Sequence, residues 1–167
     1  MLKRLKEEKS KIEKTEKFLD FKKEHQKAYF YAAFTLYDDV KNAKWQFNYY
    51  DPKSNKTTYF ESDNEIKISS EEKIFQKNNE EPKELDLNNI KIDLDKAFSI
   101  LNELKNEKYK DQHENKFIIV VQYSDDKLVW NITYLTEELN FLNVKIDCIN
   151  GEILDEKFDS VLRFKTN

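Results

Sequence analysis

The sequence predicts an α+β fold, and three observations lead to this prediction. Segments rich in Glu, Lys and Leu, without Gly or Pro, are typical of helices. Other segments alternate apolar with polar residues, which is the pattern of a strand with one buried face. The order of a helix followed by several strands occurs twice along the 167 residues. We therefore expect two tandem helix-on-antiparallel-sheet repeats, preceded by a charged helix.

Residues 2–26 are expected to form the charged N-terminal helix, because they contain neither Gly nor Pro. Their apolar positions are sparse, with Leu5, Ile12 and Leu19 at intervals of seven. We expect the first half of this helix to be exposed to solvent and its Phe-rich second half to pack on the fold. Its role is left open, with a docking arm as one interpretation.

Charge is distributed unevenly along the chain. Residues 1–27 contain ten Lys/Arg and six Asp/Glu, a net charge of +4, whereas the other 140 residues contain nineteen and twenty-seven, a net charge of −8. Nucleic-acid binding depends on neutralising phosphates with basic residues, so we expect no nucleic-acid partner. Aromatic residues make up 14% of the chain, and this content argues against disorder although 37% of the residues are charged.

The first repeat is expected within residues 1–76. Its strands are predicted at residues 28–39, 44–50, 57–62 and 65–75, with turn residues at 51–56. Residues 77–91 follow as a polar linker or loop, since they are rich in Asn, Glu and Lys and contain Pro82.

The second repeat is expected within residues 92–167. Asp93 is a candidate N-cap. The apolar residues of the helix that follows lie on one helical stripe: Leu94, Ala97, Phe98, Leu101 and Leu104. Residues 117–124 predict a β-branched strand. Residues 129–158 predict a meander of three strands, with the Asn150-Gly151 pair as the turn before the last one.

The two halves share a local pattern. Residues 36–47 and 122–132 each have a Tyr that ends one strand, then an Asp-containing turn, then a Trp that opens the next strand. The two tryptophans are Trp45 and Trp130. This pattern favours an internal duplication.

Residues 92–157 resemble the PepSY domain, a small α+β module of the cystatin-like type. The resemblance rests on a capped helix with an early Ala and on a Trp that opens a strand. It also rests on a final strand of the form hydrophobic-Asp-x-x-x-Gly-Glu; the matching residues are Ala97, Trp130, Ile146, Asp147, Gly151 and Glu152. The first half resembles the domain only through the duplication, and it has no Gly at the corresponding turn. The resemblance implies binding or inhibition, and it carries over no catalytic residue.

The sequence offers little for catalysis or cofactor binding. With one Gly, the chain cannot form a Gly-rich phosphate loop or a Gly-x-Ser-x-Gly elbow. His25 and His113 lie outside any cluster with metal-ligand spacing, and either could stabilise a helix C-terminus. Cys148 shares a strand face with Val144 and Ile146, so we expect a buried thiol and no disulfide. We therefore predict no enzyme activity, no catalytic or metal-binding residues and no cofactor.

The aromatic strand residues leave two interpretations open. One strand face carries Trp45, Phe47 and Tyr49 in the first half, and Trp130, Ile132 and Tyr134 in the second. The preferred interpretation is that these side chains fill the core. The other is that they line a ligand pocket between helix and sheet, which a solvent-reachable cavity at Trp130 and Tyr134 would favour. Tyr31 and Tyr50 point the other way and are candidates for a contact surface.

The leading functional interpretation is a non-enzymatic protein-binding module, regulatory or inhibitory, with binding residues and partner unknown. The alternative is a small-ligand carrier, or an enzyme, that uses an aromatic cavity between helix and sheet. The chain shows no signal peptide and no apolar run as long as a membrane span. The cytoplasm is therefore the location expected by default, with the extracytoplasmic part of a longer anchored protein as the alternative. The oligomeric state is left open.

Overall fold

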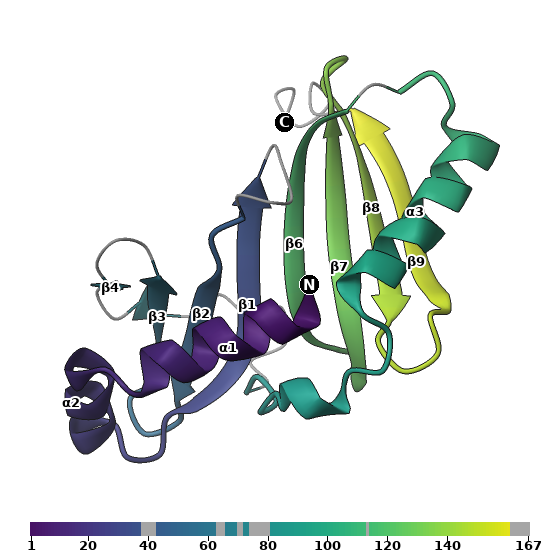
Figure 1. The fold of residues 1–167 in the computed structure, drawn as a ribbon. Helices are drawn as coiled ribbons and strands as arrows, with labels where there is room; N and C mark the ends of the chain where they lie inside the picture. Colours follow the sequence, from purple (N-terminus) through teal and green to yellow (C-terminus); the bar gives the residue numbers. More distant parts are fainter. Residues whose placement is uncertain (38–42, 63–65, 70–71, 74–80, 113, 161–167) are drawn as a thin grey trace.

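The structure is a computed structural model of the chain, and it describes residues 1–37, 43–62, 66–69, 72–73, 81–112 and 114–160. The helices in these residues are α1 (Leu2–Glu13), α2 (Glu16–Glu24), the short 3₁₀ helix η2 (Leu87–Asn89) and α3 (Leu94–Lys108). The strands are β1 (Tyr29–Tyr37), β2 (Gln46–Asp51), β3 (Lys56–Ser62), β4 (Ile66–Ile68), β5 (Glu72–Lys73), β6 (Glu114–Ser124), β7 (Lys127–Thr136), β8 (Asn140–Asp147) and β9 (Ile153–Ser160). Figure 1 shows how they are arranged.

All of the described strands belong to one antiparallel sheet. Its order is β4-β3-β2-β1-β6-β7-β8-β9, and β5 also pairs with β3. The centre of the sheet is the pairing of β1 with β6, which runs from Ala32 opposite Gln122 to Tyr37 opposite Phe117. The fold is thus α+β, but the expectation of two tandem helix-on-sheet repeats is wrong. Because β1 and β6 pair along six positions, the two halves share one sheet and one core.

One face of the sheet carries a continuous apolar row. Directly opposed residues of neighbouring strands point to the same face, and the register links six of them in this order: Phe60, Phe47, Ala33, Val121, Trp130 and Ile146. All six are buried. The alternation that predicted each strand therefore also determines which face the helices cover.

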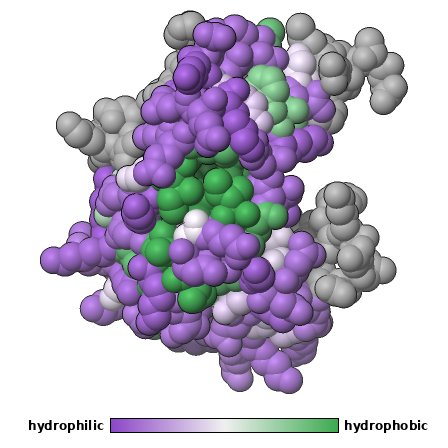
Figure 2. All heavy atoms as spheres, turned by 90° about the vertical axis from the view of Figure 1, so that its right-hand side faces the viewer, coloured by the Kyte–Doolittle hydropathy of each residue, from purple (hydrophilic) through white to green (hydrophobic). Residues whose placement is uncertain are grey.

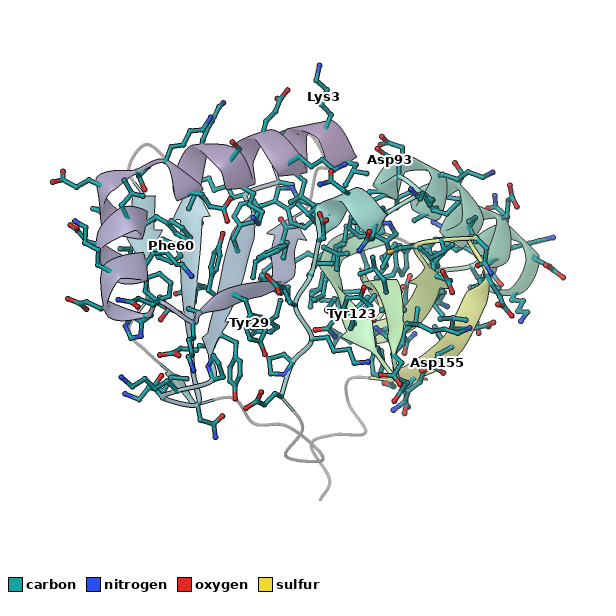
Figure 3. The ribbon with its side chains drawn as sticks, turned by 90° about the horizontal axis from the view of Figure 1, so that it is seen from below. Lys3, Tyr29, Phe60, Asp93, Tyr123 and Asp155 are labelled. Atoms are coloured by element: carbon teal, nitrogen blue, oxygen red, sulfur yellow. The ribbon has the colours of Figure 1, made fainter. Side chains whose placement is uncertain are left out.

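The helices lie on this apolar face. In Figure 1, α1 crosses in front of β1 and β2, and α3 lies in front of β8 and β9. Figure 3 shows Lys3 projecting from α1 away from the sheet, whereas Phe60 lies inside, beside α2. The centre of the Phe60 ring is 5.2 Å from the ring centres of both Phe18 and Phe21 of α2.

The predicted single helix at residues 2–26 is wrong in two respects. First, Thr15 interrupts it, because its side chain caps the backbone N–H of Phe18 and starts the new helix α2. Second, the first half is not exposed on all sides: Leu5 and Ile12 are fully buried in the core. The spacing of these two residues by seven places both on the side of α1 that faces the sheet.

Two hydrogen bonds at the N-terminal end of α1 hold it against the rest of the fold. The backbone N–H of Leu2 donates to Asp93 Oδ2 at 3.0 Å, and Asp93 lies beside the start of α1 in Figure 3. The guanidinium of Arg4 donates to the carbonyl of Ala43 at 3.0 Å. Helix α1 is therefore part of the folded core.

Helix α3 is formed as the sequence predicts. Asp93 is its N-cap and accepts a hydrogen bond from the backbone N–H of Asp95. Of the predicted stripe, Leu94, Ala97, Leu101 and Leu104 are buried and Phe98 packs against the core. The indole N–H of Trp130 donates to the carbonyl of Ile92 at 2.8 Å, which fixes the start of the helix over β7.

The segment before α3 contributes to the core. Leu85, Leu87 and Ile90 are buried, although residues 77–91 are polar enough to predict a linker. The backbone N–H of Leu85 donates to the carbonyl of Phe30 at 2.8 Å, so this segment runs beside β1. Residues 77–80 of the predicted linker lie outside the described residues.

The turn between β8 and β9 depends on Gly151. Its φ is +79°, a conformation that residues with a Cβ rarely adopt, and a Cβ there would lie 3.0 Å from Ile100 Cδ1 of α3. The turn extends from Asp147 to Glu152, which is longer than the predicted Asn150-Gly151 pair. Gly151 thus lets the turn approach α3 closely.

Candidate binding surfaces

The aromatic residues that the sequence singled out are in the core. Trp45, Phe47, Tyr49, Trp130, Ile132 and Tyr134 are all at most 2% exposed. Tyr134 donates its hydroxyl to the carbonyl of Gln112 and stacks edge-on against Phe117. Trp130 and Tyr134 are therefore packed side chains, and neither is open to solvent.

Of the two tyrosines expected at a contact surface, Tyr50 is buried. It is only 2% exposed, and its hydroxyl donates to Asn55 Oδ1 at 3.0 Å. Tyr31 is half-buried and accepts a hydrogen bond from Thr57 Oγ1 at 3.1 Å. The expectation for Tyr50 is wrong because its ring packs against that of Tyr29 and its hydroxyl is bonded to the turn between β2 and β3.

His25 lies at the C-terminal end of α2, as the sequence suggested. Its ring stacks on Phe21, and its Nδ1 lies 2.9 Å from Asp51 Oδ2. Asp51 also accepts hydrogen bonds from the N–H of Lys53 and the hydroxyl of Ser54. The carboxylate thus joins the end of α2 to the turn between β2 and β3, which is a structural role. His113 lies outside the described residues.

The pairing of Asp51 predicts a loss of stability in acid. Burial alone would raise the pKa of Asp51, but the hydrogen bonds from His25, Lys53 and Ser54 outweigh it and hold this pKa below its ordinary value. A carboxylate whose pKa is lower in the folded than in the unfolded state stabilises the fold at pH values above its pKa in the unfolded state. That stabilisation is lost as the pH falls from about 5 through the folded pKa.

We expect Asp51→Asn to lower the free energy of unfolding at pH 7 and to flatten its decrease between pH 6 and pH 3. Urea unfolding at a series of pH values measures both effects. Ser54→Ala removes one of the bonds to the carboxylate and is expected to give a smaller change of the same sign. A pH profile of Asp51→Asn identical to that of the unchanged protein would refute this role.

The described residues show few groups suited to catalysis. No three His, Cys, Asp or Glu side chains among them are placed to hold a metal ion together. Cys148 is buried, as predicted. Burial raises the pKa of its thiol, which therefore stays protonated at neutral pH and is a poor nucleophile.

A cleft of about 720 Å³ lies between α1 and the segment at residues 84–89. We call it the α1 cleft. Three aromatic side chains, Phe18, Phe30 and Tyr49, form its aromatic floor, and Lys22 also lines it. The volume lies within the range of small-molecule sites, which is roughly 300–1,000 Å³.

The two walls of the α1 cleft differ in charge. Helix α1 contributes Lys6, Lys9, Ser10 and Glu13, whereas the opposite wall contributes Glu84, Asp86, Asn88 and Asn89. Lys9 lies 4.9 Å from the centre of the Phe30 ring and donates to Glu13 at 2.6 Å. Glu13 also accepts the hydroxyl of Tyr49 at 3.0 Å. Since burial and the Glu13 carboxylate both raise the pKa of Tyr49, that hydroxyl stays protonated.

A second surface lies at the far end of the sheet, where α3 meets β9. We call it the α3–β9 surface; its apolar residues are Ile92, Ile100, Ile149, Ile153 and Phe158. Ile149 is 52% exposed and Phe158 is 39% exposed. Figure 2 shows this side of the molecule with an apolar area in its middle, framed by hydrophilic side chains.

At one end of the α3–β9 surface, Tyr109 and Lys108 contact β9. The ring of Phe158 stacks on that of Tyr109, with the ring centres 4.9 Å apart. Glu156 accepts hydrogen bonds from the hydroxyl of Tyr109 at 2.6 Å and from Lys108 at 2.9 Å. These two bonds hold the pKa of Glu156 below its ordinary value, so its carboxylate stays ionised at neutral pH.

Sequence reasoning missed both surfaces, although each leaves a signal. For the α1 cleft, the signal is a polar stripe along one side of a helix. It consists of four residues spaced by three, one and three positions: Lys6, Lys9, Ser10 and Glu13. For the α3–β9 surface, Phe158 interrupts the charged run of residues 155–159. Neither signal identifies the opposite wall, which comes from a distant part of the chain.

Comparisons with known proteins identify a similar fold. A scan of protein-family models and a search of curated proteins find no match to the chain. Among solved structures, the crystal structure of a putative lipoprotein from Clostridium difficile 630 is similar, with a TM-score of 0.51 and 17% sequence identity. The match covers 84% of this chain and 89% of the other. At this identity the likeness concerns the fold.

The helices in the described part of the chain are short and highly charged. None of them combines the length and the apolar character that a membrane crossing requires.

Proposed function

We propose that this protein is a non-enzymatic protein-binding module that acts through the α3–β9 surface. The observation that carries the proposal is the exposure of Ile149, before the start of β9, and of Phe158, near its end. Contiguous exposed apolar areas framed by polar residues are typical of sites that bind other macromolecules. The α3–β9 surface has this composition.

The resemblance of residues 92–157 to PepSY modules supports the same proposal. That resemblance implies binding or inhibition, and the apolar residues of the α3–β9 surface other than Phe158 belong to this part of the chain. A regulatory or inhibitory role towards a protein partner is therefore part of the proposal.

The experiment compares two exposed apolar residues at opposite ends of β8. Ile149 follows the strand and belongs to the α3–β9 surface, whereas Leu139 precedes it; both are 52% exposed. The tagged protein is isolated from its source cells, and native mass spectrometry determines what accompanies it. We expect a polypeptide partner to accompany the unchanged protein and the Leu139→Ser variant. With Ile149→Ser, the recovered amount of this partner should be at least severalfold lower. Equal recovery with both variants, or no polypeptide at all, would refute the proposal.

A second candidate function is the binding of a small ligand in the α1 cleft. The observation that favours it is a hollow of ligand size between a helix and the sheet, over an aromatic floor. Lysines on one wall and acidic and amide groups on the other fit a ligand that carries both a negative and a positive group. A short peptide or another zwitterion has this chemistry.

Filling the cleft tests this second candidate. Ser10 lines the cleft, whereas the neighbouring Lys11 is not among its lining residues. If the protein carries a small ligand, native mass spectrometry should show a stoichiometric adduct that Ser10→Trp abolishes and Lys11→Trp retains. An adduct that survives Ser10→Trp would place the ligand elsewhere, and a chain without any adduct would speak against the carrier.

The location of the protein belongs to the proposal as well. The cytoplasm is the default from the sequence, and the extracytoplasmic part of an anchored protein is the alternative. The structural neighbour described as a putative lipoprotein supports the alternative. Protease treatment of intact source cells distinguishes them, because only an extracytoplasmic chain would be digested.

A further inference from the structure

Strand β9 is the long open edge of the sheet. It pairs with β8 on one side and ends the strand order, whereas the opposite edge is formed by the two- and three-residue strands β5 and β4. Figure 1 shows no described element beyond β9 in the plane of the sheet. An edge strand presents unpaired N–H and C=O groups, which can pair with another strand.

Only part of β9 is regular enough to pair in this way. Between Lys145 and Ile146 of β8, the register with β9 shifts, and Leu154 is the extra residue. From Asp155 to Ser160 the pairing with β8 is continuous. A strand bends at a bulge, so any strand added to β9 is expected to lie along residues 155–160.

We propose that the strand added to β9 is β9 of a second copy of this chain, antiparallel to the first. This inference goes beyond the proposed function, because it concerns the open edge of β9 and not Ile149, at which that function is tested. A twofold axis perpendicular to the sheet relates the two copies. It passes beside Phe158, so the Phe158 rings of the two copies face each other. Lys157 of each copy then lies opposite Asp159 of the other.

The charges along β9 select this register. In a twofold antiparallel pair, opposed residues lie on the same face, so the axis passes at a residue. With the axis at Glu156, two Asp155–Lys157 pairs form, but the Glu156 carboxylates of the two copies face each other. With the axis at Lys157, lysine faces lysine and Asp155 faces Asp159. With the axis at Phe158, two Lys157–Asp159 pairs form, Glu156 faces Ser160, and no like charges are opposed.

The aromatic residue at the axis adds a reason for self-association. Phe158 is 39% exposed in one copy and stacks on Tyr109 behind it. Facing aromatic rings in adjacent strands attract each other, so pairing of two copies would cover the exposed side of both rings. The alternating charges on either side of Phe158 disfavour strands that lack the complementary pattern.

The test is a charge swap measured by analytical ultracentrifugation over a range of protein concentrations. We expect the unchanged protein to dimerise. Lys157→Asp or Asp159→Lys alone opposes like charges twice and should weaken the dimer by about tenfold in dissociation constant. The double variant Lys157→Asp/Asp159→Lys restores opposite charges and should restore the affinity. Circular dichroism of each variant checks that the monomer is folded.

Two results would overturn the inference. One is an unchanged protein that stays monomeric at all concentrations, and the other is a dimer whose affinity the single reversals leave unaltered. Neither result bears on the proposed function, which is tested by Ile149→Ser. Ile149 lies outside β9, so recovery of another polypeptide that depends on Ile149 would uphold the binding module even if β9 does not pair with itself.

Discussion

Replacement of Trp130 by Ala is expected to lower the free energy of unfolding by about 3–5 kcal/mol, the usual cost of deleting a buried Trp. Trp130 is fully buried in the middle of the apolar row, between Val121 and Ile146. Its indole N–H also donates to the carbonyl of Ile92, so the variant leaves that carbonyl without this partner. Urea unfolding followed by circular dichroism measures the loss.

A pair of milder variants separates packing from hydrogen bonding. Trp45 is equally buried, but its indole nitrogen has no hydrogen-bond partner among the described residues. Trp130→Phe therefore removes a hydrogen bond and Trp45→Phe does not, and we expect the former to cost about 1 kcal/mol more. A folded Trp130→Ala variant with unchanged stability would show that Trp130 is not a core residue, and a pocket at this position would be reconsidered.

The second large effect is expected at α1. Leu5→Ala should cost about 2–5 kcal/mol, since a buried Leu reduced to Ala leaves a cavity in the core. Leu5 is fully buried although it belongs to a helix of which most residues are charged. The measurement is again the midpoint and slope of urea unfolding.

Lys3→Ala is the matched control on the same helix. The side chain of Lys3 is 91% exposed and points away from the sheet in Figure 3. Surface substitutions of this kind usually stay within about 0.5 kcal/mol. If Leu5→Ala is as mild as Lys3→Ala, α1 does not belong to the core, and the docking-arm interpretation regains its basis.

Local patterns were sufficient to predict α3 and the strands of the second half. The N-cap Asp93 and the stripe that follows it are encoded within fifteen residues, and both are confirmed. The alternation of Trp130, Ile132 and Tyr134 likewise places these side chains on the buried face. In each case the residues that decide the structure are close together in the sequence.

The errors concern contacts between distant segments. Nothing in the local pattern of β1 or β6 shows that Ala33 pairs with Val121, yet this pairing merges the two halves into one sheet. The burial of Leu5 and Ile12 has the same origin: two apolar residues suffice on α1 because the sheet beneath them is wide and apolar. The α1 cleft also joins segments that are about seventy residues apart.

The fold places the two candidate binding surfaces over different strands of the sheet. The α1 cleft involves β1 and β2, whereas the α3–β9 surface ends the sheet beyond β8. A variant at one surface is therefore not expected to disturb the other directly. The free-energy changes caused by substitutions at distant sites are usually additive. The two candidate functions can therefore be tested independently.

The most direct test of the single sheet uses the two tryptophans, one in each half. In Trp45→Phe the remaining fluorescence reports on the second half, and in Trp130→Phe it reports on the first. Urea unfolding of each variant is followed by tryptophan fluorescence and by circular dichroism. One sheet with one core predicts coincident transitions for both probes in both variants. Separate transitions, with either tryptophan changing before the bulk of the secondary structure is lost, would show that each half has a core of its own.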